Sequence, residues 1–220
     1  MEETQTRTAL VAGASGLVGS HLLDALLEDA RYREVHSLGR RPLPKQHPKL
    51  VQHTVDFARL DAEALPTAQD AFCTLGTTIK KAGSQEAFRA VDHDAVLAFA
   101  RAAKKAGVQR FLVVTALGAN PRSRVFYNRV KGEVEEALKA MGFESLVILQ
   151  PSLLLGERAE SRPGEHAAIL ASRVLAPLLR PLASRPIEAR TVARAIVALA
   201  HAAPQGARVV PSGELQELGR

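Results

Sequence analysis

A tyrosine and a lysine stand four residues apart in this sequence, at Tyr127 and Lys131, in a segment expected to be helical. Residues four apart project from the same face of a helix. A phenol placed there can give a proton to a carbonyl oxygen or take one from an alcohol, and a neighbouring ammonium lowers the phenol's pKa from about 10. Thr115 precedes this pair and offers a hydroxyl that would hold the substrate oxygen. These residues predict a catalytic site for hydride transfer.

A plainer interpretation stays open for the same residues, in which Tyr127 packs in the interior and Lys131 is a solvated helix residue. The other tyrosine, Tyr32, has His36 at the same offset and lacks the pattern. A tyrosine and a lysine at this spacing are a weak signal alone, so the surrounding pattern has to decide.

Three glycines spaced by three, Gly13, Gly16 and Gly19, follow an apolar run near the start of the chain and lead into a leucine-rich helix. Glycine lets a ligand approach the backbone closely, and the amide groups at a helix start favour a pyrophosphate. The pattern predicts a dinucleotide site in which Ser15 adds a hydroxyl and Lys131 reaches the nicotinamide ribose. Leu17 and Val18 complete the predicted cofactor contacts of this turn. The alternative is an ordinary strand-to-helix turn.

The second expected strand, at 34–38, ends in Gly39-Arg40-Arg41. An acidic residue at this place binds the 2′-hydroxyl of NAD, whereas arginine suits the 2′-phosphate of NADP. Arg40 and Arg41 therefore predict NADP(H) as the cofactor, the alternative being a solvated basic turn. Asp56, after the third expected strand, is predicted either to accept a hydrogen bond from the adenine amino group or to cap a helix.

The rest of the chain alternates expected strands and helices, which predicts an α/β fold with a doubly wound parallel sheet. Further strands are expected at 50–55, 70–75, 110–115, 143–149 and 207–210, and helices at 61–65, 84–106, 127–141, 165–179 and 189–203. Leu75, Gly76 and Thr77 end the fourth strand, where doubly wound sheets bind ligands, so they are predicted to border the cofactor. We expect one domain over 1–220, with 151–205 as a small helical extension on the substrate side.

Composition excludes several classes of function. The net charge is +6, but the cationic residues are dispersed and aromatic residues make up only 4%, so nucleic-acid binding is not expected. Asp92-His93-Asp94 has no partner with ligand spacing, so no metal site is expected. The polar amino-terminal segment does not resemble a signal peptide, and prolines interrupt the 165–179 segment. With the single Cys73, these features predict a cytoplasmic protein without membrane insertion.

Together, the motifs resemble the atypical branch of the short-chain dehydrogenase/reductase superfamily, the branch of the HIV Tat-interacting, NADPH-binding oxidoreductases and their bacterial relatives. The segments that carry the likeness are 13–16, 38–41, 72–78, 91–94, 127–135 and 160–165. The resemblance implies a Rossmann fold with strand order 3-2-1-4-5-6-7 and NADPH on the glycine loop and the arginine pair. It also implies Tyr127 as the acid/base with Lys131 as its partner, and a nicotinamide contact from the backbone at Pro151.

This sequence departs from the family pattern at two positions. Thr115-Ala116 stands where relatives commonly have a serine pair, and Asp92 stands where many have an asparagine that relays protons. The sequence therefore predicts an NADPH-dependent oxidoreductase of a small, largely apolar carbonyl compound. The alternatives are a non-enzymatic NADPH-binding sensor or interaction protein and, below both, a sugar epimerase. The family likeness also suggests a homodimer through 84–106 and 123–141.

Overall fold

A computed structural model describes residues 6–156 and 185–220 of the chain. Its centre is a seven-stranded sheet in which every neighbouring pair of strands is parallel. In spatial order the strands are β3 (Leu50–Thr54), β2 (Tyr32–Gly39), β1 (Arg7–Ala12), β4 (Asp70–Cys73), β5 (Arg110–Val114), β6 (Ser145–Gln150) and β9 (Gly206–Pro211). The predicted order is confirmed, with β9 in the seventh place because β7 (Leu154–Leu155) and β8 (Ile187–Glu188) pair separately.

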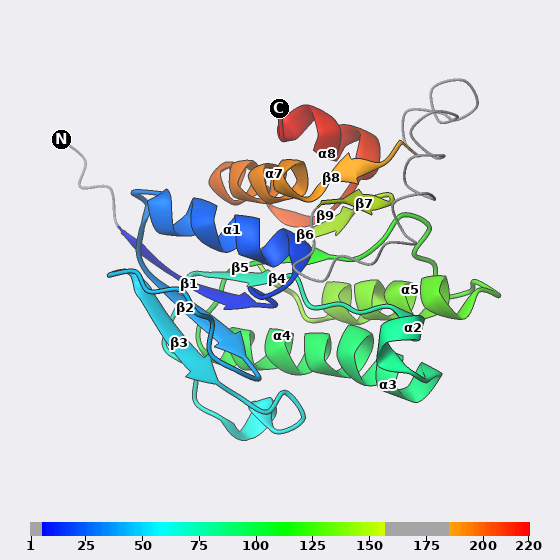
Figure 1. The fold of residues 1–220 in the computed structure, drawn as a ribbon, viewed down its shortest axis with the longest axis horizontal. Helices are drawn as coiled ribbons and strands as arrows, with labels where there is room; N and C mark the ends of the chain where they lie inside the picture. Colours follow the sequence, from blue (N-terminus) through cyan, green and yellow to red (C-terminus); the bar gives the residue numbers. More distant parts are fainter. Residues whose placement is uncertain (1–5, 157–184) are drawn as a thin grey trace.

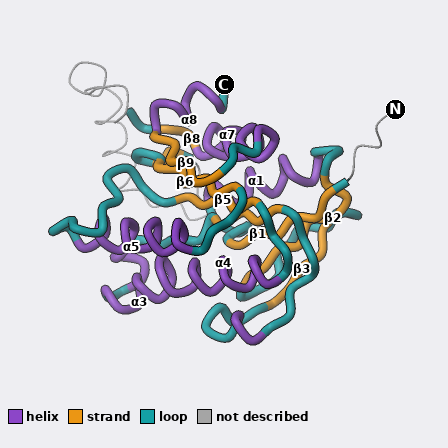
Figure 2. Tube along the Cα trace, turned by 180° about the vertical axis from the view of Figure 1, so that it is seen from behind, coloured by secondary structure: helices purple, strands orange, loops and turns teal. Residues whose placement is uncertain are grey.

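Helices cover both faces of this sheet, as Figures 1 and 2 show from opposite sides. One layer contains α1 (Leu17–Glu28), α7 (Ala189–Ala202) and α8 (Ser212–Leu218), and the other contains α4 (Ala95–Lys105) and α5 (Phe126–Ala140). Alternate residues of β1 pack against the two helical layers: Ala9 and Val11 face α1, whereas Leu10 and Ala12 face α4. This alternation of buried side chains is what a doubly wound sheet requires.

The expected extension at 151–205 stays a prediction, because residues 157–184 lie outside the described part of the chain. Helix α7 packs beside α1 and contributes Val192, Ile196 and Leu199 to the same apolar core, so it belongs to the main helical layer. The helix expected at 165–179 and the motif at 160–165 lie outside the described residues.

The helix expected at 84–106 is present but interrupted. It begins as α3 (Gln85–Arg89), capped by the Ser84 hydroxyl, which accepts a hydrogen bond from the Ala87 amide at 3.1 Å. It then forms a π-helical turn over Ala90–Asp94 and continues as α4. A π-helical turn widens the helix and changes the direction in which its side chains point, and such turns are frequent at functional sites. Here it carries Asp92.

Two shorter helical segments also differ from the expectation. The helix expected at 61–65 is only a 3-10 turn over Leu60–Ala62, and α2 (Ile79–Ala82) follows β4 where no helix was predicted. Both segments are a single turn, too short to show a helical period in the sequence.

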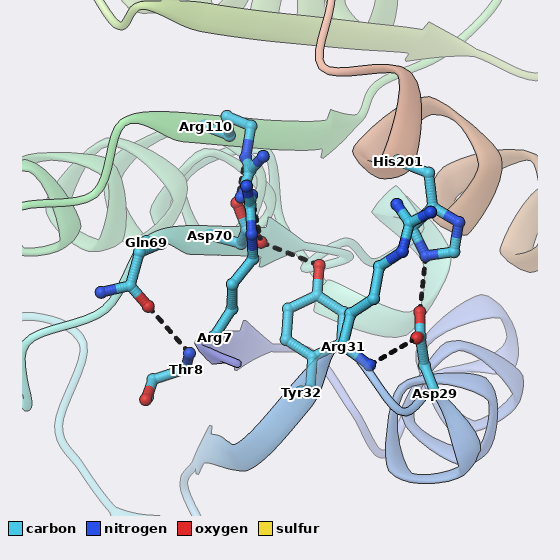
Figure 3. A network of polar contacts seen from close by, with 9 residues as sticks. All are labelled: Arg7, Thr8, Asp29, Arg31, Tyr32, Gln69, Asp70, Arg110 and His201. Atoms are coloured by element: carbon cyan, nitrogen blue, oxygen red, sulfur yellow. Dashed lines mark hydrogen bonds and ion pairs between the residues drawn. The ribbon is translucent and has the colours of Figure 1, made fainter. Parts of the chain in front are cut away.

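Near the start of β4, a buried carboxylate joins three strands (Figure 3). Tyr32 of β2 donates its hydroxyl hydrogen to Asp70 Oδ2 at 2.8 Å, and Arg110 Nε of β5 donates to Asp70 Oδ1. Arg7 Nη1 of β1 lies 3.6 Å from Asp70 Oδ2. Burial raises the pKa of Asp70 to about 6, against the lowering effects of the Tyr32 hydrogen bond and the Arg7 charge. The carboxylate therefore depends on these donors for its solvation.

We expect Tyr32→Phe to lower the free energy of unfolding by about 2 kcal/mol, because a hydrogen bond to a buried charged group is worth that order. Tyr127→Phe is the matched control, since the Tyr127 hydroxyl makes no hydrogen bond within the described residues. The control should change stability by less than about 0.5 kcal/mol. Urea unfolding at neutral pH measures both variants. Equal losses in the two would contradict a stabilising role for the Tyr32–Asp70 hydrogen bond.

Candidate functional site

The turn between β1 and α1 contains two glycines that no other residue type can replace unless the neighbouring backbone moves. Gly13 has φ of +92°, and a Cβ there would lie 2.6 Å from the carbonyl carbon of Thr74. A Cβ on Gly19 would lie 2.1 Å from the carbonyl oxygen of Gly13. The absence of these two side chains lets α1 begin directly against the ends of β1 and β4.

The start of α1 is open to an anion. Gly16 is its N-cap, no side chain caps it, and its first turn contains no acidic residue. Ser15 is exposed beside the turn, whereas Leu17 is half-buried and Val18 is buried beneath it. Helix starts of this kind bind phosphate groups through free amides and the helix dipole. The glycine turn therefore fits the pyrophosphate of a dinucleotide.

Arg40 and Arg41 follow the carboxyl end of β2 and are exposed. Within the described part of the chain, neither guanidinium takes part in a hydrogen bond or an ion pair. The loop after them is fixed by Gln52 of β3, whose Oε1 accepts from the Leu43 amide at 2.6 Å and whose Nε2 donates to the Lys45 carbonyl at 2.9 Å. Both arginines are thus available to an anionic ligand, beside a loop that is itself held in place.

Asp56 does not cap a helix. Its Oδ1 accepts a hydrogen bond from the Ala58 amide at 3.0 Å in a tight turn, and the N-cap of the nearby 3-10 turn is Arg59. The helix-cap interpretation is therefore wrong, while the contact with adenine stays a prediction.

Lys131 does not lie in solvent. Its Nζ is 2.8 Å from Asp92 Oδ1, and the two side chains are only 5% and 1% exposed. The Thr77 amide donates to Asp92 Oδ2 at 2.8 Å. Gly76 lies directly against this ion pair, since a Cβ there would lie 3.4 Å from Asp92 Oδ1 and 3.8 Å from Lys131 Nζ. The π-helical turn and α5 thus bring this ion pair to residues 75–77 at the end of β4, where the sequence predicted a cofactor contact.

Tyr127 lies one helical turn before Lys131, half-buried, with its ring centroid 5.4 Å from that of Phe88. Burial raises the pKa of Tyr127; the Lys131 charge opposes this shift and the Asp92 charge adds to it. The sequence predicted the opposite direction, and that prediction is wrong for the protein without a ligand. The reason is that burial of the phenol is the largest influence on its pKa and outweighs the opposing charge of Lys131.

Thr115 directly follows β5 and is buried. Its side chain contacts Glu135 of α5 and not Tyr127 or Lys131. Its hydroxyl donates to Glu135 Oε1 at 2.6 Å, and Gln150 Nε2 lies 3.0 Å from both carboxylate oxygens of Glu135. Tyr127, Lys131 and Glu135 recur every four residues, so they follow one face of α5. The structure thus places Thr115 with Glu135, two turns beyond Tyr127, and its predicted contact with a substrate oxygen stays a prediction.

Sequence reasoning missed Glu135 altogether and assigned no structural partner to Asp92. The four-residue spacing from Lys131 was the available signal for Glu135. Pro151, predicted to contact the nicotinamide, is buried after β6, and its carbonyl accepts a hydrogen bond from the Leu117 amide at 2.9 Å. It therefore joins the loops that follow β5 and β6.

Apolar side chains surround this end of the sheet. The large apolar residues that are exposed after β4, β5 and β6 and before α5 are Ile79 at the start of α2, and Leu117, Val125 and Leu153 in the loops. Exposed apolar groups gathered at a polar site are a feature of ligand-binding surfaces.

Comparison with known proteins agrees with this geometry. A profile described as NAD(P)H-binding matches residues 13–203. The chain belongs to this NAD(P)H-binding family. The protein FMP52, mitochondrial, of Eremothecium gossypii is 35% identical to this chain over 215 residues, which cover 96% of each chain. Protein HTATIP2 of Rattus norvegicus is 38% identical over 169 residues, covering 74% of this chain and 69% of that protein. The resemblance found in the sequence is confirmed.

Solved structures of NAD(P)H-binding proteins share the fold. The human epimerase family protein SDR39U1 with NADPH superposes with a TM-score of 0.65 and 19% identity, over 97% of this chain and 80% of that one. MoeE5 in complex with UDP-glucose and NAD gives a TM-score of 0.70 and 20% identity, over 96% and 80%. These identities establish the fold alone, and the two structures hold different cofactors.

Two further features of the structure bear on metal binding and on membranes. Among residues 6–156 and 185–220, no group of three histidine, cysteine or acidic side chains is placed to hold a metal ion. The helices in those ranges include none long and apolar enough to cross a bilayer. The predicted cytoplasmic location stays a prediction, because FMP52 of Eremothecium gossypii and of Aspergillus fumigatus are named mitochondrial.

Proposed function

We propose that this protein reduces a small, largely apolar carbonyl compound with NADPH, and that Tyr127 donates the proton. The observation that supports the proposal is that Lys131, one turn after Tyr127 on α5, lies with Asp92 at Gly76 and Thr77, directly after the residues that pack on Gly13 of the glycine turn. A proton donor and a dinucleotide-binding turn thus meet at the carboxyl end of the sheet, where doubly wound folds bind their ligands.

Separate groups of residues suit the pyrophosphate and the 2′-phosphate of the cofactor. The open start of α1, with Gly13, Gly16, Gly19 and Ser15, suits the pyrophosphate, and Val18 and Leu17 form the floor beside it. Arg40 and Arg41 suit a 2′-phosphate, because guanidinium groups bind phosphate through two donors at once. NADPH, when bound, supplies a hydride.

Tyr127 has the protonation state that reduction needs. Its raised pKa keeps the phenol protonated at neutral pH, so it can donate to a carbonyl oxygen as that oxygen gains negative charge. The carbonyl carbon gains a hydride and its oxygen a proton, which gives an alcohol and leaves a tyrosinate. Solvent then returns the proton to Tyr127. Lys131 stabilises the tyrosinate while it lasts, since the ammonium lies one turn away on the same helix face.

The exposed apolar side chains near the site support an apolar substrate. Leu117, Val125 and Leu153 offer contacts that favour a hydrocarbon group on the carbonyl compound over a sugar nucleotide.

A non-enzymatic NADPH sensor is the second candidate, favoured by one specific observation. Thr115 donates its hydroxyl hydrogen to Glu135 and so does not present it to a substrate. A sensor needs the cofactor site without turnover. A homodimer through α4 and α5, or another protein partner, stays a prediction in either case.

The cofactor preference is tested by fluorescence titration of the purified protein with NADPH and NADH. We expect NADPH to bind more tightly, and Arg40→Ala/Arg41→Ala to weaken NADPH binding by about 100-fold while leaving NADH binding within about threefold, since two charge-assisted contacts to phosphate are lost. Arg59→Ala, an exposed arginine beyond Asp56, is the matched control.

The same samples are then assayed with a panel of aldehydes and ketones by NADPH absorbance. Turnover that prefers apolar compounds supports the reductase. NADPH-selective binding with no turnover on the whole panel supports the sensor. Equal affinity for the two cofactors, unchanged by the arginine substitutions, would exclude the proposed 2′-phosphate site.

A further inference from the structure

The loops that leave the carboxyl ends of β4, β5 and β6 carry positive charge only. Lys80 and Lys81 follow β4, Arg122 and Arg124 follow β5, and the ranges 74–84, 115–125 and 151–156 contain no acidic residue. All four cationic residues are exposed, and within the described part of the chain none of their side chains takes part in a hydrogen bond or an ion pair. We call these four residues the basic rim.

Cations on the helices of the same layer have acidic partners instead. Arg89 Nη1 lies 2.6 Å from Glu133 Oε2, and Lys139 Nζ lies 2.8 Å from Glu136 Oε1. The basic rim is therefore a local excess of charge and not the average surface of a cationic protein. An excess of one sign at a binding surface raises the local concentration of ligands of the opposite sign.

The loop that carries the two arginines of the rim has a fixed shape. The Arg122 amide donates to Asn120 Oδ1 at 2.8 Å, and Arg129 Nη1 of α5 donates to the Ser123 carbonyl at 3.1 Å. The loop also packs closely on α5, because a Cβ on Gly132 would lie 2.2 Å from the carbonyl carbon of Asn120. A loop held in this way loses little backbone entropy when a ligand binds to it.

Both parts of the basic rim border the start of α5, where Tyr127 lies. The arginine loop ends at Val125, the N-cap of α5. The two lysines lie in α2, which leads into α3, and the ring centroid of Phe88 in α3 is 5.9 Å from that of Phe126 and 5.4 Å from that of Tyr127. Figure 1 shows α2 and α3 beside this end of α5. A ligand at Tyr127 therefore lies in the field of these four charges.

The basic rim combines its charges with exposed hydrocarbon. Ile79 directly precedes Lys80, and Val125 directly follows Arg124. Val125 and Leu153 are each 58% exposed. Cationic and apolar groups that share one surface complement a ligand that has both an anionic group and an apolar body.

The proposed cofactor does not account for this charge. Its pyrophosphate and its 2′-phosphate are assigned to the glycine turn after β1 and to Arg40 and Arg41 after β2. In the sheet, β1 separates β2 from β4, so the arginine pair and the basic rim lie on opposite sides of the glycine turn. The reduced nicotinamide ring carries no charge. The basic rim is therefore available to the substrate.

We propose that the carbonyl substrate carries an acidic group, a carboxylate or a phosphate, at the far end of its apolar body, and that the basic rim binds this group. The inference rests on the proposed function and names the substrate class of the same site. Arg122 and Arg124 make the main contacts, because a guanidinium group binds either acid through paired donors. Lys80 and Lys81 add attraction as point charges.

The test uses ω-oxo carboxylic acids of increasing chain length and their methyl esters, which differ in charge but share the aldehyde and the hydrocarbon chain. With NADPH, we expect kcat/KM for the best acid to exceed that for its ester by about tenfold or more, because the ester loses a charge-assisted contact. This preference should shrink as the salt concentration rises, since salt screens exposed charges.

Substitution of the two arginines tests the assigned contacts. Arg122→Gln/Arg124→Gln should lower the acid-to-ester ratio of kcat/KM about tenfold, mainly through a higher KM for the acid. Arg31→Gln/Lys139→Gln is the matched control, because it removes the same charge from two exposed residues, one in the turn before β2 and one in the last turn of α5. The control should leave the ratio unchanged.

Binding is measured separately, so that the substrate class can be judged without turnover. A saturated carboxylic acid of the preferred chain length, or of each length where no turnover is found, and its primary amide are titrated by calorimetry into the protein with NADPH. We expect the acid to bind about tenfold more tightly, and the two arginine substitutions to abolish this difference. Cosedimentation with vesicles of phosphatidylglycerol and phosphatidylcholine tests the other source of acidic groups on hydrocarbon, a lipid surface.

Equal kcat/KM for acids and esters at every chain length, or a preference that the arginine substitutions leave unchanged, would overturn the proposal and leave the reductase intact. Absence of turnover on all these compounds contradicts the proposed function instead, and the calorimetric difference between acid and amide then decides the inference. Vesicle binding that depends on the two arginines, without a preference for the acid in either assay, would assign the basic rim to a lipid surface and exclude a substrate site.

Discussion

Tyr127→Phe is expected to lower carbonyl turnover by about 100-fold to 10 000-fold, which is the range that a positioned general acid contributes. The substitution removes one oxygen atom and keeps the ring that packs on Phe88. NADPH binding should therefore stay within about threefold of the unmodified protein, since neither the glycine turn nor the arginine pair is touched. Measuring kcat together with the NADPH dissociation constant separates the two effects.

The pH dependence gives this prediction a second readout. The pKa of Tyr127 is raised, so the unmodified protein should keep its reduction rate through neutral and mildly alkaline pH, and lose it only above the usual tyrosine value of about 10. Any residual rate in Tyr127→Phe should show no such decline, because no phenol remains to ionise. Unchanged kcat in Tyr127→Phe would exclude Tyr127 as the proton donor, and would move the proposal toward the sensor.

The fold was predictable because its signals are local. Alternating or continuous apolar runs predicted the strands. The order of the seven strands was implied by the resemblance to a known family, and the structure has that order. Gly13 and Gly19 were predicted from spacing alone, and the structure gives the reason: a side chain on either would collide with backbone atoms. A steric requirement of this kind leaves a sequence pattern because one residue type satisfies it.

The electrostatics of the site were not predictable in the same way. Asp92 and Lys131 are separated by 39 positions in the sequence, and they meet because a π-helical turn redirects one helix toward another. Sequence spacing placed Lys131 on the correct helix face, but it predicted neither the Asp92 partner nor the burial of the phenol. Burial is the largest cause of the raised pKa of Tyr127, so the direction of that shift was predicted wrongly. Thr115 was likewise placed at the end of the correct strand, whereas its contact with Glu135 depends on how α5 packs across the sheet.

Lys131→Met is expected to lower the free energy of unfolding by about 3–5 kcal/mol at neutral pH, because it leaves Asp92 buried without its counter-ion. Methionine has a similar length, so loss of packing should contribute little. Lys80→Met, in exposed α2, is the matched control and should cost less than about 0.5 kcal/mol. Urea unfolding of the two variants measures the difference.

The loss in Lys131→Met should depend on pH in a defined direction. Burial raises the pKa of Asp92 above its usual 3.8, and Lys131 is the largest influence that opposes this shift. Without the lysine, the folded protein holds a proton on Asp92 that the unfolded chain releases, so stability falls as the pH rises from about 4 toward neutral. Lys131→Met should therefore be closest to the unmodified protein at acid pH.

Adding Asp92→Asn to Lys131→Met should restore most of the lost stability and remove this pH dependence, because no buried charge is left unpaired. It should not restore turnover, since the ammonium that stabilises the tyrosinate is still missing. If Lys131→Met is instead as stable as Lys80→Met at every pH, the Asp92 carboxylate is stabilised in the interior by something other than Lys131.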